Sequence, residues 1–158
     1  MTQQTVAPVS RTITVAASQE RAFRVFTEQL GTWWPKEYHI GQVDMADFVL
    51  ERKVGGRWYE IGVDGTECVT GRVLAYEPPE RLMLAWQLNG NWQYDPDPTH
   101  ASEVEVRFIA EGSNRTRVEL EHRAFERHGD GAGAVYGSVE SPTGWTYCLE
   151  LFSQEVAA

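Results

Sequence analysis

A long alternation of apolar and polar residues, from about residue 46 to residue 123, constrains the fold of this chain most. In the clearest segment, Val104, Val106 and Phe108 alternate with charged residues. A period of two is that of a β-strand, whose successive side chains point to opposite faces. Turn signals such as Gly55-Gly56 and Asp64-Gly65 separate these segments. We therefore predict a meander of antiparallel strands with an apolar face and a solvated face.

Helical patterns flank this region. Segment 9–15 alternates like a strand, and Ser18 then begins a predicted helix over about 18 to 30 that Gly31 closes. Pro35 favours a loop for Trp33 and Trp34. Near the C-terminus, Ser141-Pro142 predicts the cap and first position of a second helix. The apolar stripe of that helix consists of Trp145, Cys148, Leu149, Phe152 and Val156.

The order strand, helix, antiparallel strands, long helix predicts an α+β fold in which a curved antiparallel sheet wraps around the C-terminal helix. With 158 residues, the chain is expected to form one domain over 9–158, preceded by a flexible N-terminal arm over 1–8.

Charge excludes some classes of partner. The chain has 14 Lys and Arg against 23 Asp and Glu, a net charge of −9, which argues against nonspecific binding to nucleic acid or to an anionic membrane. It shows no apolar run as long as a membrane span and no basic N-terminal start typical of a signal peptide. Cys68 and Cys148 match no metal or redox motif. We expect a cytoplasmic protein with two free thiols.

Several motifs resemble one family. They are Gly55-Gly56-Arg57-Trp58-Tyr59-Glu60, Asp64-Gly65, Thr70-Gly71-Arg72-Val73-Leu74-Ala75-Tyr76-Glu77-Pro78-Pro79-Glu80-Arg81-Leu82, Ala85-Trp86 and Ser141-Pro142-Thr143-Gly144-Trp145. This pattern resembles the AHSA-type (activator of heat-shock-protein-90 ATPase homologue-like) branch of the SRPBCC, or START-like, superfamily. The resemblance covers about residues 9 to 156. It implies a helix-grip fold with a cavity between the sheet and the C-terminal helix, and it associates the chain with stress response.

The chain contains six Trp, six Tyr and six Phe, more aromatic residues than a core of this size needs. In the implied fold many of them converge on the cavity, as binding residues for a small hydrophobic or aromatic molecule. Plain core packing is the alternative, weaker for Trp33, Trp34 and Trp92 because they lie in loop-like segments. The candidate binding residues are Trp33, Trp34, Trp58, Glu60, Trp86, Trp92, Tyr94, His122, Trp145, Leu149 and Phe152.

His122 and Glu60 are the candidate acid–base residues, because both share the parity of inward-facing apolar neighbours. A satisfied structural histidine is the alternative for His122. Arg52 either points inward as well or lies at the solvent rim. His39, His100 and His128 lack the spacing of metal ligands, and no phosphate-binding loop occurs. We expect neither a metal nor a cofactor.

Segment 89–100 is a polar loop that nevertheless carries Trp92 and Tyr94, and we interpret it either as a lid over the cavity or as a contact in a homodimer. Three functions follow in order. The first is a module that binds a small hydrophobic molecule without chemistry, so that the chain is more probable as a non-enzyme. The second is a cyclase or aromatase, and the third is a chaperone-associated interaction domain.

Overall fold

The computed structural model describes residues 7–157, in which seven strands form one antiparallel sheet. The spatial order is β1-β7-β6-β5-β4-β3-β2. The strands are β1 Val9–Val15, β2 Met45–Leu50, β3 Arg57–Gly62, β4 Glu67–Glu77, β5 Arg81–Trp86, β6 Ser102–Gly112 and β7 Arg115–Arg123. The predicted meander is confirmed. The predicted arm over 1–8 lies outside the described residues except for Ala7 and Pro8, which belong to no element.

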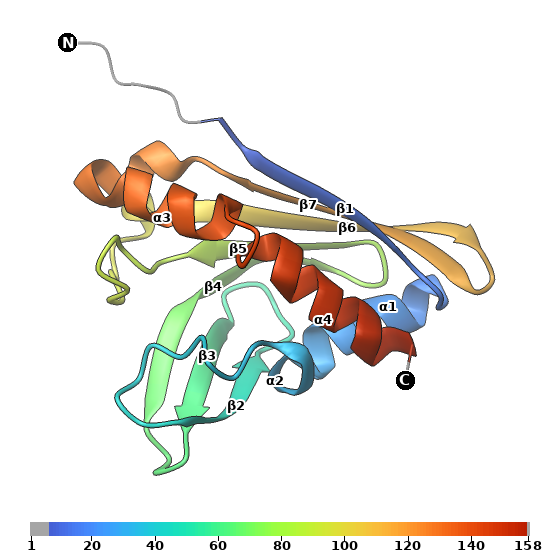
Figure 1. The fold of residues 1–158 in the computed structure, drawn as a ribbon, viewed down its shortest axis with the longest axis horizontal. Helices are drawn as coiled ribbons and strands as arrows, with labels where there is room; N and C mark the ends of the chain where they lie inside the picture. The colour runs from blue at the N-terminus through green and yellow to red at the C-terminus, as the bar shows by residue number, and fades with distance from the viewer. Residues whose placement is uncertain (1–6, 158) are drawn as a thin grey trace.

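Helices cover the concave side of this sheet. Figure 1 shows the sheet curled around α4, with α1 beside the C-terminal half of that helix and α3 near its beginning. The helical elements are α1 Gln19–Glu28, α2 Leu30–Trp33, η1 Pro98–His100, η2 Phe125–Gly131, α3 Ala132–Glu140 and α4 Trp145–Ala157. The predicted α+β helix-grip architecture is therefore correct.

The N-terminal helix begins as predicted but ends earlier. The Ser18 side chain accepts a hydrogen bond from the backbone N–H of Arg21, which confirms the predicted cap. Gln29 has φ −115° and ψ 28°, which breaks the helix after Glu28. One further turn, α2, then contains Gly31 and Trp33, so the predictions that Gly31 closes the helix and that Trp33 lies in a loop were wrong.

The C-terminal helix begins three residues after the predicted cap pair. Ser141 is extended and terminates α3, and the backbone N–H of Gly144 then donates to the Ser141 carbonyl over 2.9 Å. Residues 141–144 therefore form a turn between two helices, and α4 starts at Trp145. Its predicted apolar stripe is buried throughout. The correction arises because Ser141 caps the end of one helix instead of the start of the next.

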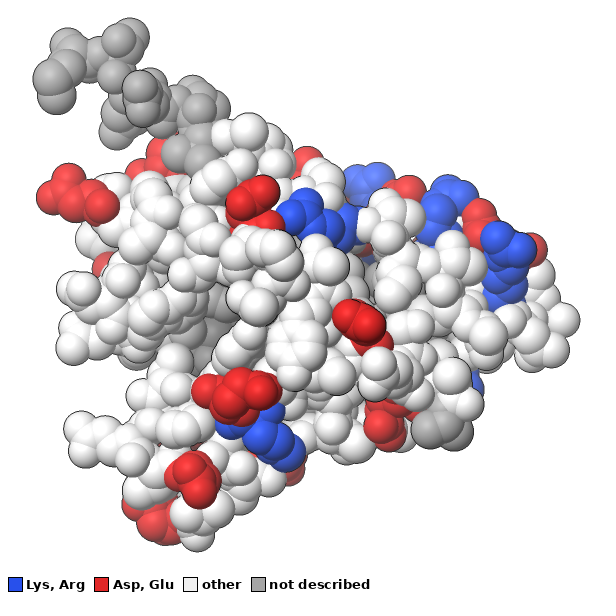
Figure 2. Space-filling view, viewed as in Figure 1, with Lys and Arg blue, Asp and Glu red and all other residues white. Residues whose placement is uncertain are grey.

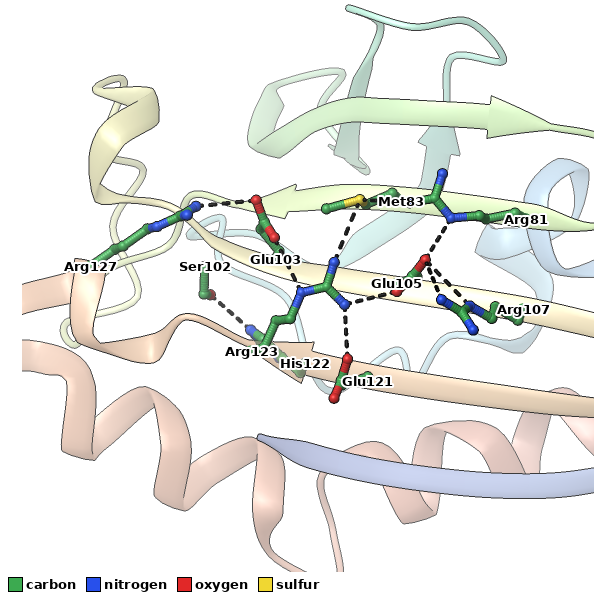
Figure 3. Close-up of polar contacts among 10 residues, drawn as sticks. All are labelled: Arg81, Met83, Ser102, Glu103, Glu105, Arg107, Glu121, His122, Arg123 and Arg127. Carbon is green, nitrogen blue, oxygen red and sulfur yellow. Dashed lines mark hydrogen bonds and ion pairs between the residues drawn. The ribbon is translucent and has the colours of Figure 1, made fainter. Parts of the chain in front are cut away.

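The convex face of the sheet carries an ion-pair network, which Figure 3 shows around Glu105. Glu105 pairs with Arg81, Arg107 and Arg123, which project from β5, β6 and β7. Burial raises the pKa of Glu105, but hydrogen bonds from Arg123 and Arg81 outweigh it and lower the pKa to about 2. This strand position was predicted to face solvent, whereas Glu105 is only 6% exposed because the arginine side chains cover it.

Candidate functional site

A cavity of about 420 Å³ lies between the inner face of the sheet and the start of α4. Figure 2 shows the molecule hollowed on the side where residues 36–44 approach α3. The wall is contributed by β2 to β5, the segment after α2, the end of α3 and the start of α4. The lining residues are Trp34, Tyr38, His39, Ile40, Phe48, Glu60, Thr70, Trp86, Leu88, Trp92, Ser138, Val139, Ser141, Thr143, Gly144, Trp145 and Cys148.

Tryptophan rings form much of the wall and pack edge to face. The ring of Trp34 lies 5.8 Å from that of Trp145 and 5.2 Å from that of Phe48. Trp86 lies 5.9 Å from Trp145, so the three indoles surround the same volume from the sheet, the helix and the loop. Such packed rings keep the wall rigid and give a flat apolar molecule a large contact area. The arrangement suits recognition of an aromatic ligand.

The mouth of the cavity is formed by its exposed lining residues Tyr38, Trp92, Ser138 and Thr143. The Tyr38 hydroxyl donates to the Thr143 carbonyl over 2.7 Å, which ties the segment after α2 to the turn before α4. Trp92 is 40% exposed, and its backbone adopts the left-handed φ of 59° in the loop after β5. Its ring approaches Trp86 at 6.2 Å and therefore partly covers the opening.

Glu60 supplies a carboxylate to this otherwise apolar cavity. The residue lies on β3 and is 2% exposed. Its two carboxylate oxygens accept hydrogen bonds from the backbone N–H groups of Ile40, over 2.6 Å, and Gly41, over 3.0 Å. These bonds hold the carboxylate and fix the 40–41 backbone against the sheet. Thr70, on the neighbouring strand β4, adds a buried hydroxyl to the same wall.

Two buried indole N–H groups on the cavity-lining residues lack an acceptor within the described chain. They belong to Trp34 and Trp86, of which 8% and 5% are exposed. By contrast, the Trp58 N–H donates to the Ala85 carbonyl over 3.0 Å, and the Trp33 N–H to the Val25 carbonyl over 3.2 Å. A buried donor left without a partner costs free energy. The wall of the cavity therefore holds polar groups that protein packing alone does not satisfy.

His122 lies behind the cavity wall. Its Nδ1 accepts from the Trp145 indole over 3.0 Å, and its Nε2 lies 2.8 Å from the Ser102 hydroxyl, a contact that Figure 3 shows. The same hydroxyl lies 2.7 Å from Nε2 of His128. Burial, with a smaller contribution from His128, lowers the pKa of His122 well below its usual value. His122 is thus a neutral, hydrogen-bonded residue that the ring of Trp145 separates from the cavity.

The structure brings only part of the predicted set to the cavity. Five of the candidates line it, namely Trp34, Glu60, Trp86, Trp92 and Trp145. The others, which pack in the core or beside the 89–100 loop without lining the cavity, are Trp33, Trp58, Tyr94, His122, Leu149 and Phe152. The prediction of low packing demand was wrong for Trp33 and Trp34, which are 2% and 8% exposed because α2 packs them against the core. Arg52 lies at the surface and pairs with Glu28, as the rim alternative stated.

Sequence reasoning missed several wall residues, among them Tyr38, Ile40 and Val139. They lie in irregular segments or at a helix end, where periodicity carries no information about direction. The aromatic Tyr38, four residues after Trp34, is the one signal that pointed to this segment.

The two cysteines are free thiols, as predicted. Burial raises the pKa of Cys148 to about 12, so this cavity-lining thiol stays protonated. Among residues 7–157, no group of three or more His, Cys, Asp or Glu side chains is arranged to hold a metal ion. None of the helices in that range is long and apolar enough to cross a membrane.

Comparison with known proteins agrees with this geometry. Residues 16–157 match the family described as "Activator of Hsp90 ATPase homolog 1-like protein". The anthrahydroquino-gamma-pyrone synthase Txn09, solved in complex with SUM, is 41% identical, with a TM-score of 0.68 and coverage of 98% of this chain and 99% of that one. CalC of Micromonospora echinospora, a self-sacrificing resistance protein, is 35% identical, with a TM-score of 0.70 and coverage of 94% and 93%.

A third structure, the HSP90 activator PFC0360w of Plasmodium falciparum, is 20% identical and has a TM-score of 0.52, covering 73% of this chain and 71% of that one. At that identity the likeness concerns the fold alone. No curated protein matches the chain. The chain belongs to the family of activator of Hsp90 ATPase homolog 1-like proteins, within the SRPBCC group of helix-grip folds.

Proposed function

We propose that this protein binds a small, largely apolar aromatic molecule in the cavity between the sheet and α4. The observation that carries the proposal is the cavity itself, whose volume of about 420 Å³ is walled by Trp34, Trp86, Trp92 and Trp145. Small-molecule sites typically span about 300–1,000 Å³ and combine apolar walls with a few placed polar groups. Glu60 and Thr70 are such groups here.

The relatives support this proposal. Txn09 was solved in complex with SUM, and its name describes a synthase of a fused aromatic product. We propose the lid interpretation for the 89–100 loop, because Trp92 from this loop lines the cavity. The cytoplasmic location, the homodimer and the roles in stress response and chaperone interaction stay predictions.

Titration of the intrinsic tryptophan fluorescence with fatty acids, flavonoids and aromatic polyketides tests the binding. Because the cavity wall is made of indoles, a polycyclic aromatic is expected to change the emission saturably, and a straight-chain fatty acid much less. Ser138→Trp, an exposed substitution at the mouth, is expected to block binding. Ala134→Trp, on the same helix but away from the cavity, is the matched control. A flat response to the whole panel contradicts the proposal.

A second candidate function is catalysis of a ring closure, favoured by Glu60, the one carboxylate among the cavity-lining residues, and by the name of Txn09. Glu60 would take the proton of a substrate hydroxyl or enol as that oxygen adds to a ketone carbon. Protons then pass to the ketone oxygen, which leaves as water. Incubation with a hydroxyanthraquinone that carries a 1,3-diketone side chain is expected to give a product lighter by one water. Formation of that product at the rate of the buffer control contradicts this candidate.

A further inference from the structure

The carboxylate of Glu60 is buried without a cationic partner. Within residues 7–157, none of the ion pairs involves Glu60, although the residue is only 2% exposed. His39, the other titratable side chain near it on the wall, directs its Nδ1 to the Gly41 carbonyl at 2.9 Å. A buried charge is costly unless hydrogen bonds or counter-charges compensate for it. The cavity therefore favours a ligand that brings a hydrogen-bond donor to this carboxylate.

The two backbone hydrogen bonds leave room for such a donor. An ionised carboxylate offers about four acceptor sites on its two oxygens. The N–H groups of Ile40 and Gly41 occupy one site on each oxygen. They approach from the segment that borders the cavity, and Glu60 itself lines it. One further hydroxyl can thus bind the carboxylate without displacing either backbone contact.

The opposite polarity is available on the indoles of Trp34 and Trp86, whose N–H groups lack acceptors. Both nitrogens are covered by neighbouring side chains, so a ligand reaches them when an adjacent ring moves. Trp92 is the most exposed of the six tryptophans and contacts Trp86, which makes it the ring whose displacement disturbs the core least. An ammonium ligand would satisfy Glu60 but would leave both donors unpaired. A ligand with a hydroxyl and a carbonyl satisfies both kinds of group.

We propose that the ligand is a flat polycyclic aromatic that donates a phenolic or enolic hydroxyl to Glu60 and accepts, through a carbonyl oxygen, from Trp34 or Trp86. This inference rests on the proposed function and specifies the chemistry of its ligand. The carboxylate reads the hydroxyl, the indoles read the carbonyl, and the stacked rings hold the apolar frame. The pocket then selects oxygenated aromatics over hydrocarbons of the same shape.

Four ligands of nearly the same size test it at pH 6, where the phenol keeps its proton: anthracene, anthraquinone, 2-hydroxyanthraquinone and 2-methoxyanthraquinone. Affinities are measured by calorimetry. The hydroxy compound is expected to bind about tenfold or more tightly than its methyl ether, since a hydrogen bond to a charged group is at stake. Anthraquinone is expected to bind more tightly than anthracene. These comparisons use the unchanged protein and so do not depend on the folding of any variant.

Variants then assign the groups. Glu60→Gln is expected to remove the preference for hydroxy over methoxy while anthraquinone still binds. Trp86→Phe and Trp34→Phe are expected to reduce the preference for anthraquinone over anthracene. Trp33→Phe is the matched control, because that indole has a backbone acceptor and does not line the cavity. Equal binding of all four ligands overturns the inference but leaves the proposed function standing, whereas no binding of any ligand overturns both.

Discussion

The indole Nε1 of Trp145 donates a hydrogen bond to Nδ1 of His122 over 3.0 Å, so that a buried histidine orients a ring of the cavity wall from behind. Because this bond uses Nδ1 as the acceptor, the proton of the neutral imidazole lies on Nε2, which donates to the Ser102 hydroxyl over 2.8 Å. The Ser102 hydroxyl can in turn donate to His128. His122 is therefore a positioning residue for Trp145 and not a group that touches a ligand.

Replacing His122 by Phe tests this role. The ring keeps its contact with Phe125, now 4.4 Å away, but the Trp145 indole and the Ser102 hydroxyl each lose a partner. We expect the free energy of unfolding in urea to fall by about 1–3 kcal/mol, the cost of leaving buried polar groups unpaired. Ligand affinity is expected to fall as well, because Trp145 is no longer held. Unchanged values of both would show that the hydrogen bond does not fix the wall.

Stability is expected to fall as the pH drops below about 6.5, the usual pKa of a histidine. Burial lowers the folded-state pKa of His122, so in this range the unfolded chain takes up a proton that the folded protein does not. The free energy of unfolding then falls with decreasing pH, by up to about 1.4 kcal/mol per pH unit for this group. His128, also lowered mainly by burial, acts with the same sign, whereas His100, raised by Asp95, is exposed and acts with the opposite one.

Urea unfolding of the wild type and His122→Phe between pH 8 and pH 5 measures this contribution. The variant is expected to lose less stability over that range than the wild type. Parallel pH dependences in the two proteins would mean that His122 accepts a proton in the folded state.

Glu105→Gln is expected to lower the free energy of unfolding by about 2 kcal/mol, because charge-assisted hydrogen bonds from three arginines depend on this nearly buried carboxylate. Glu119→Gln is the matched control, since its pair with Arg117 is solvent-exposed and is expected to contribute less than about 1 kcal/mol. Denaturant unfolding at pH 7 compares them. A loss no larger for Glu105 than for Glu119 would contradict the importance of burial in this network.

Gly71 permits a close approach of β4 to the strand that follows it in the sheet. A Cβ at this position would lie 1.8 Å from the Ala85 carbonyl oxygen and 2.7 Å from Nε1 of Trp58. Gly71→Ala is therefore expected to break the Trp58–Ala85 hydrogen bond and to destabilise the fold by about 3 kcal/mol or more. Gly137→Ala, in an open position of α3, is expected to stabilise by about 0.5–1 kcal/mol. Thermal unfolding of both variants checks the contrast, and a similar midpoint in the two would refute it.

Local patterns in the sequence predict much of this fold. The alternation along β3 and β7 correctly placed Glu60 and His122 on the inner face, because strand side chains alternate regardless of distant contacts. The cap at Ser18 and the stripe of α4 were likewise correct, since capping and helical periodicity act over a few residues. The overlap of motifs with one family then predicted how these elements assemble.

Only the tertiary structure decided which inward residues reach the cavity. Trp33 and Trp34 are adjacent, yet Trp33 packs against α1 and α4 while Trp34 also lines the cavity, since α2 turns the two rings to different sides. Glu105 looked solvated on its own strand, but the register between β5, β6 and β7 surrounds it with arginines. His122 is inward, and Trp145 from a distant helix separates it from the cavity. Direction along a strand is a local property, whereas access to a cavity depends on the side chains that long-range packing sets in front of it.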